Sequence, residues 1–255
     1  MNARAKQERI ETLYMMGFSY AEAKKFVENC ESRPAVTFIS SAERSWGFDL
    51  TQSQRSFGVE IECLVNRQKL INAALFEGRN ISSELYNHTD RRDIFKIVSD
   101  SSVMGEDPNE VVSPVLTGAD GVIHLKDVCT ALANARAKVN KTCGLHVHIS
   151  AEGMTEDEQM MVFRLYAKAE KVIDSFMPKS RRGNENCYCR SIANYIGKSK
   201  REVIRLGRYH KVNLTALFNH GTIEFRQHSG SVEYEKIQNW ISFCAGLVDY
   251  VKHHI

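Results

Sequence analysis

The sequence of 255 residues predicts an α+β fold, and two observations lead to this prediction. Short segments with alternating apolar and polar residues, typical of half-buried strands, recur between segments with apolar residues at helical spacing. The two kinds of element intermix along the chain, and several strands keep a polar face opposite the apolar one. We therefore expect helices on one side of a sheet whose other face carries polar side chains.

The composition is that of a soluble globular protein, with 43% hydrophobic and 25% charged residues. A net charge of +3 is too small to indicate binding to nucleic acid or to a membrane surface. No apolar run of about 18 residues occurs and no apolar segment follows the charged start, so we expect neither a transmembrane helix nor a secretory signal. The seven cysteines, without a C-x-x-C pair, are typical of reduced thiols in the cytoplasm.

The chain predicts three regions. Residues 1–34 predict a helical hairpin, because residues 4–30 have apolar side chains near helical spacing with a break at Gly17. Residues 35–54, rich in Ser, Arg and Gln, predict a linker or an irregular arm. Short strands and amphipathic helices follow, so we expect the main domain to span residues 55–255.

Within the main domain, strands and helices follow from period and capping signals. Thr155 and Glu158 form a capping-box pattern that predicts the start of a helix, and Gly207 closes another. The other predicted helices cover residues 68–77, 122–139, 198–206 and 232–252. The predicted strands are FGVEIECLV (57–65), a segment within 93–103, EVVSPVL (110–116, stopped by Pro114), CGLHVHIS (143–150) and GTIEFRQH (221–228).

Three of these strands carry ionisable side chains on the face opposite their apolar residues. These are Glu60 and Glu62, His146 and His148, and Glu224 and Arg226. Each pattern alone is usual for a solvent-exposed face. If the strands are neighbours in one sheet, however, several carboxylates share one face and repel one another unless cations lie among them. Hard divalent ions suit carboxylate ligands, and Mg²⁺ sites usually also take substrate phosphate.

Seven segments then identify a family resemblance, which covers residues 55–250. The segments SFGVEIE, KIVSDSSV, EVVSPVL, CGLHVHIS, PKSRRGN, RYHKVNL and TIEFRQHSG occur in the order seen in the amidoligase family. That family is related to glutamine synthetase and glutamate–cysteine ligase. GLHVHIS resembles the histidine motif of glutamine synthetases, and TIEFR resembles their late Glu-x-Arg motif. The resemblance implies a bacterial or phage protein, located in the cytoplasm of the bacterium or infected host.

The resemblance implies a glutamine-synthetase-like catalytic domain over residues 55–255. Its sheet is expected to be curved and mostly antiparallel, forming a half-barrel with flanking helices on the convex face. The nucleotide would enter at one end and the amine substrate at the other. The chain is much shorter than a glutamine synthetase and lacks a recognisable ammonium-site loop. The chemistry can therefore carry over while the substrate and the assembly differ.

The implied activity is that of an ATP-dependent carboxylate–amine ligase. A carboxylate attacks the γ-phosphate of ATP to give an acyl phosphate, and an amine then displaces phosphate to leave an amide. Two or three Mg²⁺ or Mn²⁺ ions would bridge the ATP phosphates. The implied partners are ATP, a carboxylate, and an amine that is an amino acid, a polyamine or a peptide or protein. Nucleic acid and membrane are not expected.

The resemblance also implies roles for individual residues. The implied metal ligands are Glu60, Glu62, Glu110, His146 and Glu224. The implied catalytic residues are Arg226, which would clamp the transferred phosphoryl group, Glu224 and His148. The nucleotide- or phosphate-binding candidates are His148, Arg208 and Arg226. The substrate-binding candidates are Asp100, Ser102, Arg181 and Arg182.

Two alternatives to the ligase stay open. The chain could be a catalytically inactive binding module of the same fold. His146, His148 and a carboxylate could also form the site of a non-haem metal oxygenase or cupin, since Glu152 completes an H-x-H-x₃-E pattern. The third cupin histidine is absent, however, and Glu60 and Glu62 would have no role. A P-loop kinase is excluded because no G-x-x-x-x-G-K-[ST] segment occurs.

Overall fold

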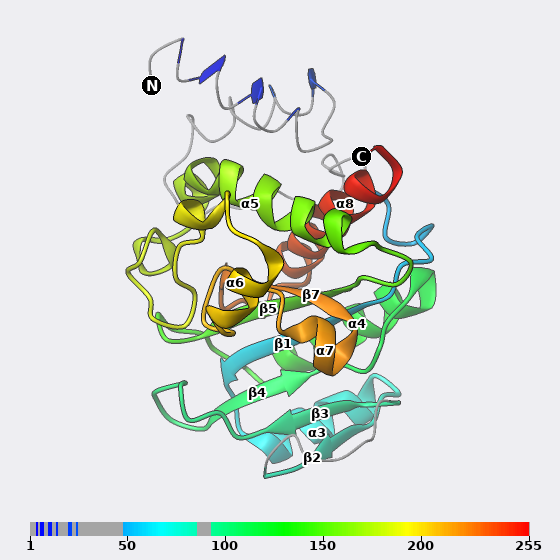
Figure 1. Ribbon diagram of the computed structural model, residues 1–255. Coiled ribbons are helices and arrows are strands. Elements are labelled where there is room, and N and C mark those ends of the chain that lie inside the picture. The colour runs from blue at the N-terminus through cyan, green and yellow to red at the C-terminus, as the bar shows by residue number, and fades with distance from the viewer. Residues whose placement is uncertain are drawn as a thin grey trace. The chain divides into compact units, whose positions relative to one another are not determined.

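The computed structural model describes residues 48–85 and 93–254, together with nine separate positions between residues 4 and 24. Apart from those positions, the predicted hairpin lies outside the described residues, as does most of the predicted linker. The fold is α+β, with a seven-stranded, mostly antiparallel sheet and flanking helices (Figure 1). The chain divides into two compact units. The first unit comprises Asp49–Ile149 and His228–Ile241, and the second comprises Met1–Phe48, Ser150–Gln227 and Ser242–Ile255.

Among its described residues up to Ile149, the first unit holds five strands and two helices. They are β1 (Phe57–Leu64), α3 (Arg67–Phe76), β2 (Ile81–Ser83), β3 (Phe95–Val98), β4 (Pro108–Val112), α4 (Gly118–Asn134) and β5 (Gly144–Ser150). The strands lie in the order β2-β3-β4-β1-β5, with β2 and β3 parallel and the other pairs antiparallel. Val59, Ile61 and Cys63 alternate on the buried face of β1. Figure 1 shows α3 and α4 behind these strands, and the ring of Phe95 on β3 packs 4.9 Å from that of His124 on α4.

The second unit is built on two long helices and a short strand pair. Its elements are α5 (Glu156–Phe176), two 3₁₀ turns (Lys179–Arg181 and Ala193–Tyr195), α6 (Lys200–Arg205), β6 (Val212–Asn213), α7 (Ala216–His220), β7 (Thr222–Ser229) up to Gln227, and α8 (Tyr234–His254) from Ser242 onward. Strand β6 pairs antiparallel with β7. The predicted capping box of Thr155 and Glu158 begins α5. Tyr166 of α5 forms the core with Phe225 and Phe243, whose ring centroids lie 5.6 and 6.4 Å away.

Several boundaries differ from the sequence prediction for local reasons. The helix predicted over 122–139 is α4, which begins earlier and ends at Asn134. Arg136 has a left-handed φ of 57°, and the backbone of Lys138 then pairs with that of Leu64, so the chain has already left the helix. Strands β2 and β6 and helix α7 were not predicted. They have two to five residues, which is too short for a periodic signal.

The sheet is not strongly curled (Figure 1), so the expected half-barrel is not found. Strong curvature comes from bulges in long strands, whereas β2 and β6 have only three and two residues. Among the described residues, no helix combines the length and the apolar surface needed to cross a membrane. Helices α5 and α8 have 21 residues each, but both are amphipathic.

Candidate functional site

Strand register brings four of the predicted metal ligands together in the first unit. Glu60 of β1 lies directly opposite His146 of β5, and Glu62 lies directly opposite Glu110 of β4. Directly paired residues point to the same face of a sheet, with Cβ atoms about 4.5–5.5 Å apart. The polar side chains of three adjacent strands therefore share one face.

His146 contacts both glutamates of β1. Its Nδ1 lies 2.9 Å from Glu60 Oε2, and its Nε2 lies 3.4 Å from Glu62 Oε1. His148 Nε2 lies 3.5 Å from the other carboxylate oxygen of Glu60. The side chains of the two histidines are only 5% and 14% exposed. Neither histidine is a solvent-exposed residue, so these two side chains do not form the solvent-exposed face that is usual for such a strand.

The donor geometry fits divalent cations. Ligand atoms of Glu60, Glu110 and His146 all lie within 4.8 Å of one another, and so do those of Glu62, Asp100 and Glu110. Ligands that lie 2.0–2.6 Å from one ion are at most about 5 Å apart. Carboxylate oxygens with one imidazole nitrogen suit Mg²⁺ or Mn²⁺. Glu110 is common to both groups, so it could serve two neighbouring ions.

The surroundings keep the Glu60 carboxylate ionised and orient that of Glu62. Burial alone would raise the pKa of Glu60, but hydrogen bonds from His146 and His148 outweigh burial and hold that pKa well below its usual value. The backbone N–H of Gly144 donates to Glu62 Oε2 at 2.6 Å. Glu60 is therefore ready to accept a cation without first losing a proton.

The structure gives Asp100 a different neighbourhood from the one that the sequence indicates. The N–H of Ser102 donates to Asp100 Oδ1 at 2.6 Å, an Asx-type turn directly after β3. This turn places the Asp100 carboxylate with Glu62 and Glu110, so Asp100 could be a metal ligand rather than a substrate-binding group. Ser102, half-buried, contributes its backbone to that turn.

Lys96 is a polar-face residue that the sequence analysis missed. In the β3–β4 register, Val98 lies opposite Glu110 and Lys96 lies opposite Val112, so Lys96 shares the face of Glu110. The lysine is 5% exposed, with its Nζ 4.0 Å from Glu84. The sequence signal for this residue is the single lysine in the otherwise apolar segment FKIV, which forms β3.

The second unit holds the late Glu-x-Arg pair on β7. Arg226 Nη1 donates to Glu224 Oε1, and Asn213 of β6 donates to the other carboxylate oxygen at 2.6 Å. Arg226 Nε donates to the Tyr188 carbonyl at 3.3 Å. Glu224 and Arg226 are 4% and 8% exposed. The expected convergence of Glu224 with the ligands of the first unit stays a prediction.

The other predicted anion binders of the second unit differ in accessibility. Arg181 is 2% exposed, with Nη1 3.8 Å from Cys189 Sγ. Arg182 is half-buried and donates from Nε to the Met177 carbonyl at 2.7 Å. Arg208 is exposed. Arg208 therefore offers the most accessible cation of the three.

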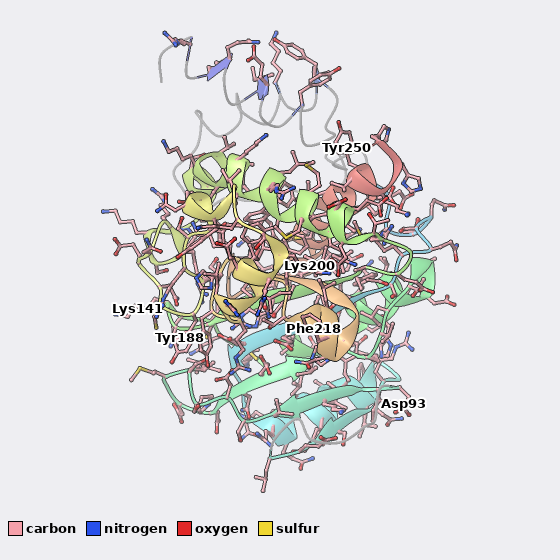
Figure 2. The ribbon with its side chains drawn as sticks, in the orientation of Figure 1. Asp93, Lys141, Tyr188, Lys200, Phe218 and Tyr250 are labelled. Atoms are coloured by element: carbon pink, nitrogen blue, oxygen red, sulfur yellow. The ribbon has the colours of Figure 1, made fainter. Side chains whose placement is uncertain are left out.

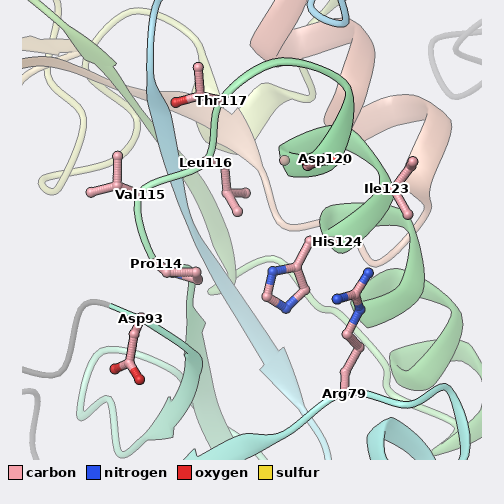
Figure 3. Close-up of a pocket in the computed structure, with 10 residues that line it drawn as sticks. Arg79, Asp93, Pro114, Val115, Leu116, Thr117, Asp120, Ile123 and His124 are labelled. Atoms are coloured by element: carbon pink, nitrogen blue, oxygen red, sulfur yellow. The ribbon is translucent and has the colours of Figure 1, made fainter.

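A cavity of about 510 Å³ lies elsewhere in the first unit (Figure 3). It is lined by the segment after β4 and the first turns of α4, with Arg79 and His124 on one side and Asp93 on another. Arg79 already pairs with Asp127 at 2.8 Å. Burial and the Arg79 charge lower the pKa of His124, which favours its neutral form. The cavity therefore has no surplus of positive charge for a triphosphate.

A comparison with protein-family models agrees with the motifs. A family described as "Putative amidoligase enzyme" matches residues 53–205 and 195–248. The chain belongs to this amidoligase family. The matched residues include all of the candidate site residues above. A search of curated proteins finds no match for this amidoligase.

Family membership suggests ligase activity and weakens the oxygenase alternative. In that alternative Glu152 would complete a metal site with His146 and His148. Glu152 is exposed in the turn after β5. Among the described residues, the groups able to hold a metal do not include it.

Proposed function

We propose that this amidoligase is an ATP-dependent carboxylate–amine ligase that forms an amide bond through an acyl phosphate. One observation carries the proposal. In a member of the amidoligase family, Glu60 and Glu62 face His146 and Glu110 across adjacent strands. Carboxylates gathered on one face repel one another, and hard divalent cations, the usual partners of ATP phosphates, would relieve that repulsion.

The metal-holding roles divide between two groups of residues. Glu60, Glu110 and His146 would hold one ion, and Glu62, Asp100 and Glu110 a second. Glu224 is proposed as a further ligand, on the basis of its motif. When bound, Mg²⁺ or Mn²⁺ neutralises charge on the β- and γ-phosphate oxygens of ATP. Every one of these ligand groups offers an oxygen or an imidazole nitrogen, as such ions require.

Arg226 is proposed to hold the migrating phosphoryl group. Its guanidinium is a planar fork, oriented by hydrogen bonds to Glu224 and to the Tyr188 carbonyl. The fork can bind two phosphoryl oxygens at once, which a lysine cannot do. His148 is proposed to contact the nucleotide phosphates, and Arg208 is a second cation for them.

The reaction needs two displacements. A carboxylate oxygen of the first substrate forms a bond to the γ-phosphorus while the bond from that phosphorus to the bridging oxygen of ADP breaks. The amine nitrogen then attacks the acyl carbon, phosphate leaves with its bonding electrons, and the nitrogen gives up a proton. Both steps bring anions together, so positioning and charge neutralisation supply most of the catalysis.

The test is ADP release from Mg-ATP with panels of carboxylates and of amines, including amino acids, polyamines and peptides. Hydroxylamine in place of the amine should intercept the acyl phosphate as a hydroxamate. Glu62→Gln should abolish both products, whereas the matched change Glu152→Gln, in an exposed turn, should leave them unchanged. Hydroxamate without ATP would refute the mechanism. Binding of ATP without ADP release across the panel would instead support an inactive binding module.

A further inference from the structure

Two half-exposed tyrosines lie side by side on the surface of the second unit. Tyr188 (labelled in Figure 2) is 43% exposed and Tyr209 is 39% exposed. Their ring centroids are 5.5 Å apart in an edge-to-face arrangement. The Arg208 guanidinium lies 5.0 Å from the Tyr209 ring centroid and donates to its hydroxyl at 3.2 Å. Aromatic rings and a cation thus form one accessible surface.

Backbone hydrogen bonds connect this surface to β7. The N–H of Arg190 donates to the Tyr209 carbonyl, the N–H of Lys211 to the Arg190 carbonyl, and the N–H of Arg226 to the Lys211 carbonyl, at 2.9–3.0 Å. The segment around residue 190 is therefore two chain spacings from β7, or roughly 10 Å. The side chain of Arg226 crosses this space, because its Nε donates to the Tyr188 carbonyl.

A buried ionic network holds the tyrosine-bearing loop in place. Lys211 is completely buried, and its Nζ lies 2.9 Å from Glu170 Oε1 and 2.6 Å from Asp174 Oδ1 of α5. The second oxygen of each carboxylate accepts a backbone N–H of the loop, from Ile192 at 2.8 Å and from Gly183 at 2.9 Å. The loop is anchored at both ends, so the exposure of the tyrosine rings does not come from a loosely held segment.

We propose that Tyr188, Tyr209 and Arg208 form the surface on which the base of ATP stacks. This inference rests on the proposed function and names the part of the nucleotide that the second unit recognises. Every nucleobase has a π-face that stacks on aromatic rings, and a neighbouring arginine adds a cation–π contribution. Arg226 donates to the carbonyl of Tyr188, so its guanidinium lies next to the tyrosine surface. The phosphates of a nucleotide whose base stacks on the tyrosines would extend toward this guanidinium.

The experiment compares two ligands that share phosphates but differ in the base. Calorimetric titrations with Mg-ATP and with magnesium tripolyphosphate are made on wild type, Tyr188→Ala, Tyr209→Ala and Tyr209→Phe. The control is Tyr250→Ala, which removes a tyrosine that stacks on His254 in α8. Tyr188→Ala and Tyr209→Ala should each weaken ATP binding by about five-fold to a hundred-fold. Tripolyphosphate binding should not change, and Tyr209→Phe and the control should bind ATP like wild type.

Wild-type ATP affinity in both Tyr188→Ala and Tyr209→Ala would overturn the proposal. Equal losses for ATP and tripolyphosphate would also overturn it, since they would indicate a structural role of the tyrosines. The Tyr188 carbonyl that receives Arg226 belongs to the backbone and remains in Tyr188→Ala. The titrations do not depend on turnover, so a selective loss of ATP affinity without ADP formation by wild type would support the stacking surface and count against the ligase.

Discussion

Replacement of His146 by alanine is the most direct test of the candidate metal site in the first unit. The imidazole is the only nitrogen donor in the group that it forms with Glu60 and Glu110. Loss of even an outer-shell partner of a metal ligand costs about 10–100-fold in metal affinity. Loss of the ligand itself should therefore weaken Mn²⁺ or Mg²⁺ binding by at least that factor, or about 1.4–2.7 kcal/mol.

The variant should stay folded. Leu145, Val147 and Ile149, on the opposite face of β5, are completely buried and unchanged by the substitution. The substitution removes the hydrogen bond with Glu60, and a hydrogen bond to a charged group contributes about 1.5–3 kcal/mol. That is less than the 5–15 kcal/mol typical of a folded domain.

The assay is a Mn²⁺ titration without nucleotide, followed by electron paramagnetic resonance, beside steady-state ADP release. His148→Ala is the matched control, because His148 contacts Glu60 but is proposed to act on the nucleotide. Because it removes a contact to Glu60 and not a proposed metal ligand, it should weaken metal binding less than His146→Ala does, and it should lower turnover. If folded His146→Ala binds Mn²⁺ as tightly as wild type, the metal-ligand assignment fails.

Three further predictions concern Lys211, Arg226 and the N-terminal residues 1–34. Lys211→Met leaves the buried carboxylate of Glu170 and the partly exposed carboxylate of Asp174 without this cation, so urea unfolding should show a loss of about 3–5 kcal/mol; a loss below 1 kcal/mol would contradict this. Arg226→Lys should lower kcat for ADP release more than it raises the KM for ATP, because a lysine lacks the planar fork; an unchanged kcat would exclude the clamp. Deletion of residues 1–34 should leave a folded, ATP-binding protein as judged by circular dichroism and calorimetry, whereas an insoluble product would mean that these residues complete the core.

The strands that carry the site could be predicted from sequence because their pattern is strictly local. In β1, β5 and β7, alternation assigns each side chain to a face with no knowledge of the partner strand. The polar assignment of Glu60 and His146 follows from that period alone. Capping residues such as Thr155 and Gly207 likewise set helix ends through contacts within one turn.

What could not be predicted depends on contacts between distant segments. The grouping of Asp100 with Glu110 requires the β3–β4 register and the turn after β3. The burial of Lys211 depends on two carboxylates that precede it by 37 and 41 residues. Tyr188 lies in an irregular segment, where no period exists to assign a face. The end of α4 depended on Arg136 adopting a left-handed φ, which non-glycine residues rarely do.

The pairing of Glu62 with Glu110 argues that the polar face of the first unit exists for a purpose other than stability. Like charges directly opposite one another on antiparallel strands are destabilising. Within the face, the Gly144 N–H donates to Glu62 and His146 Nε2 lies 3.4 Å from it, which offsets part of that repulsion. A fold under no constraint but its own stability would gain by replacing either glutamate with a neutral residue. A divalent cation between the strands reverses the balance, because each carboxylate then gains an ionic bond. The proposed binding of divalent cations therefore accounts for a pairing of glutamates that costs stability when no cation is bound.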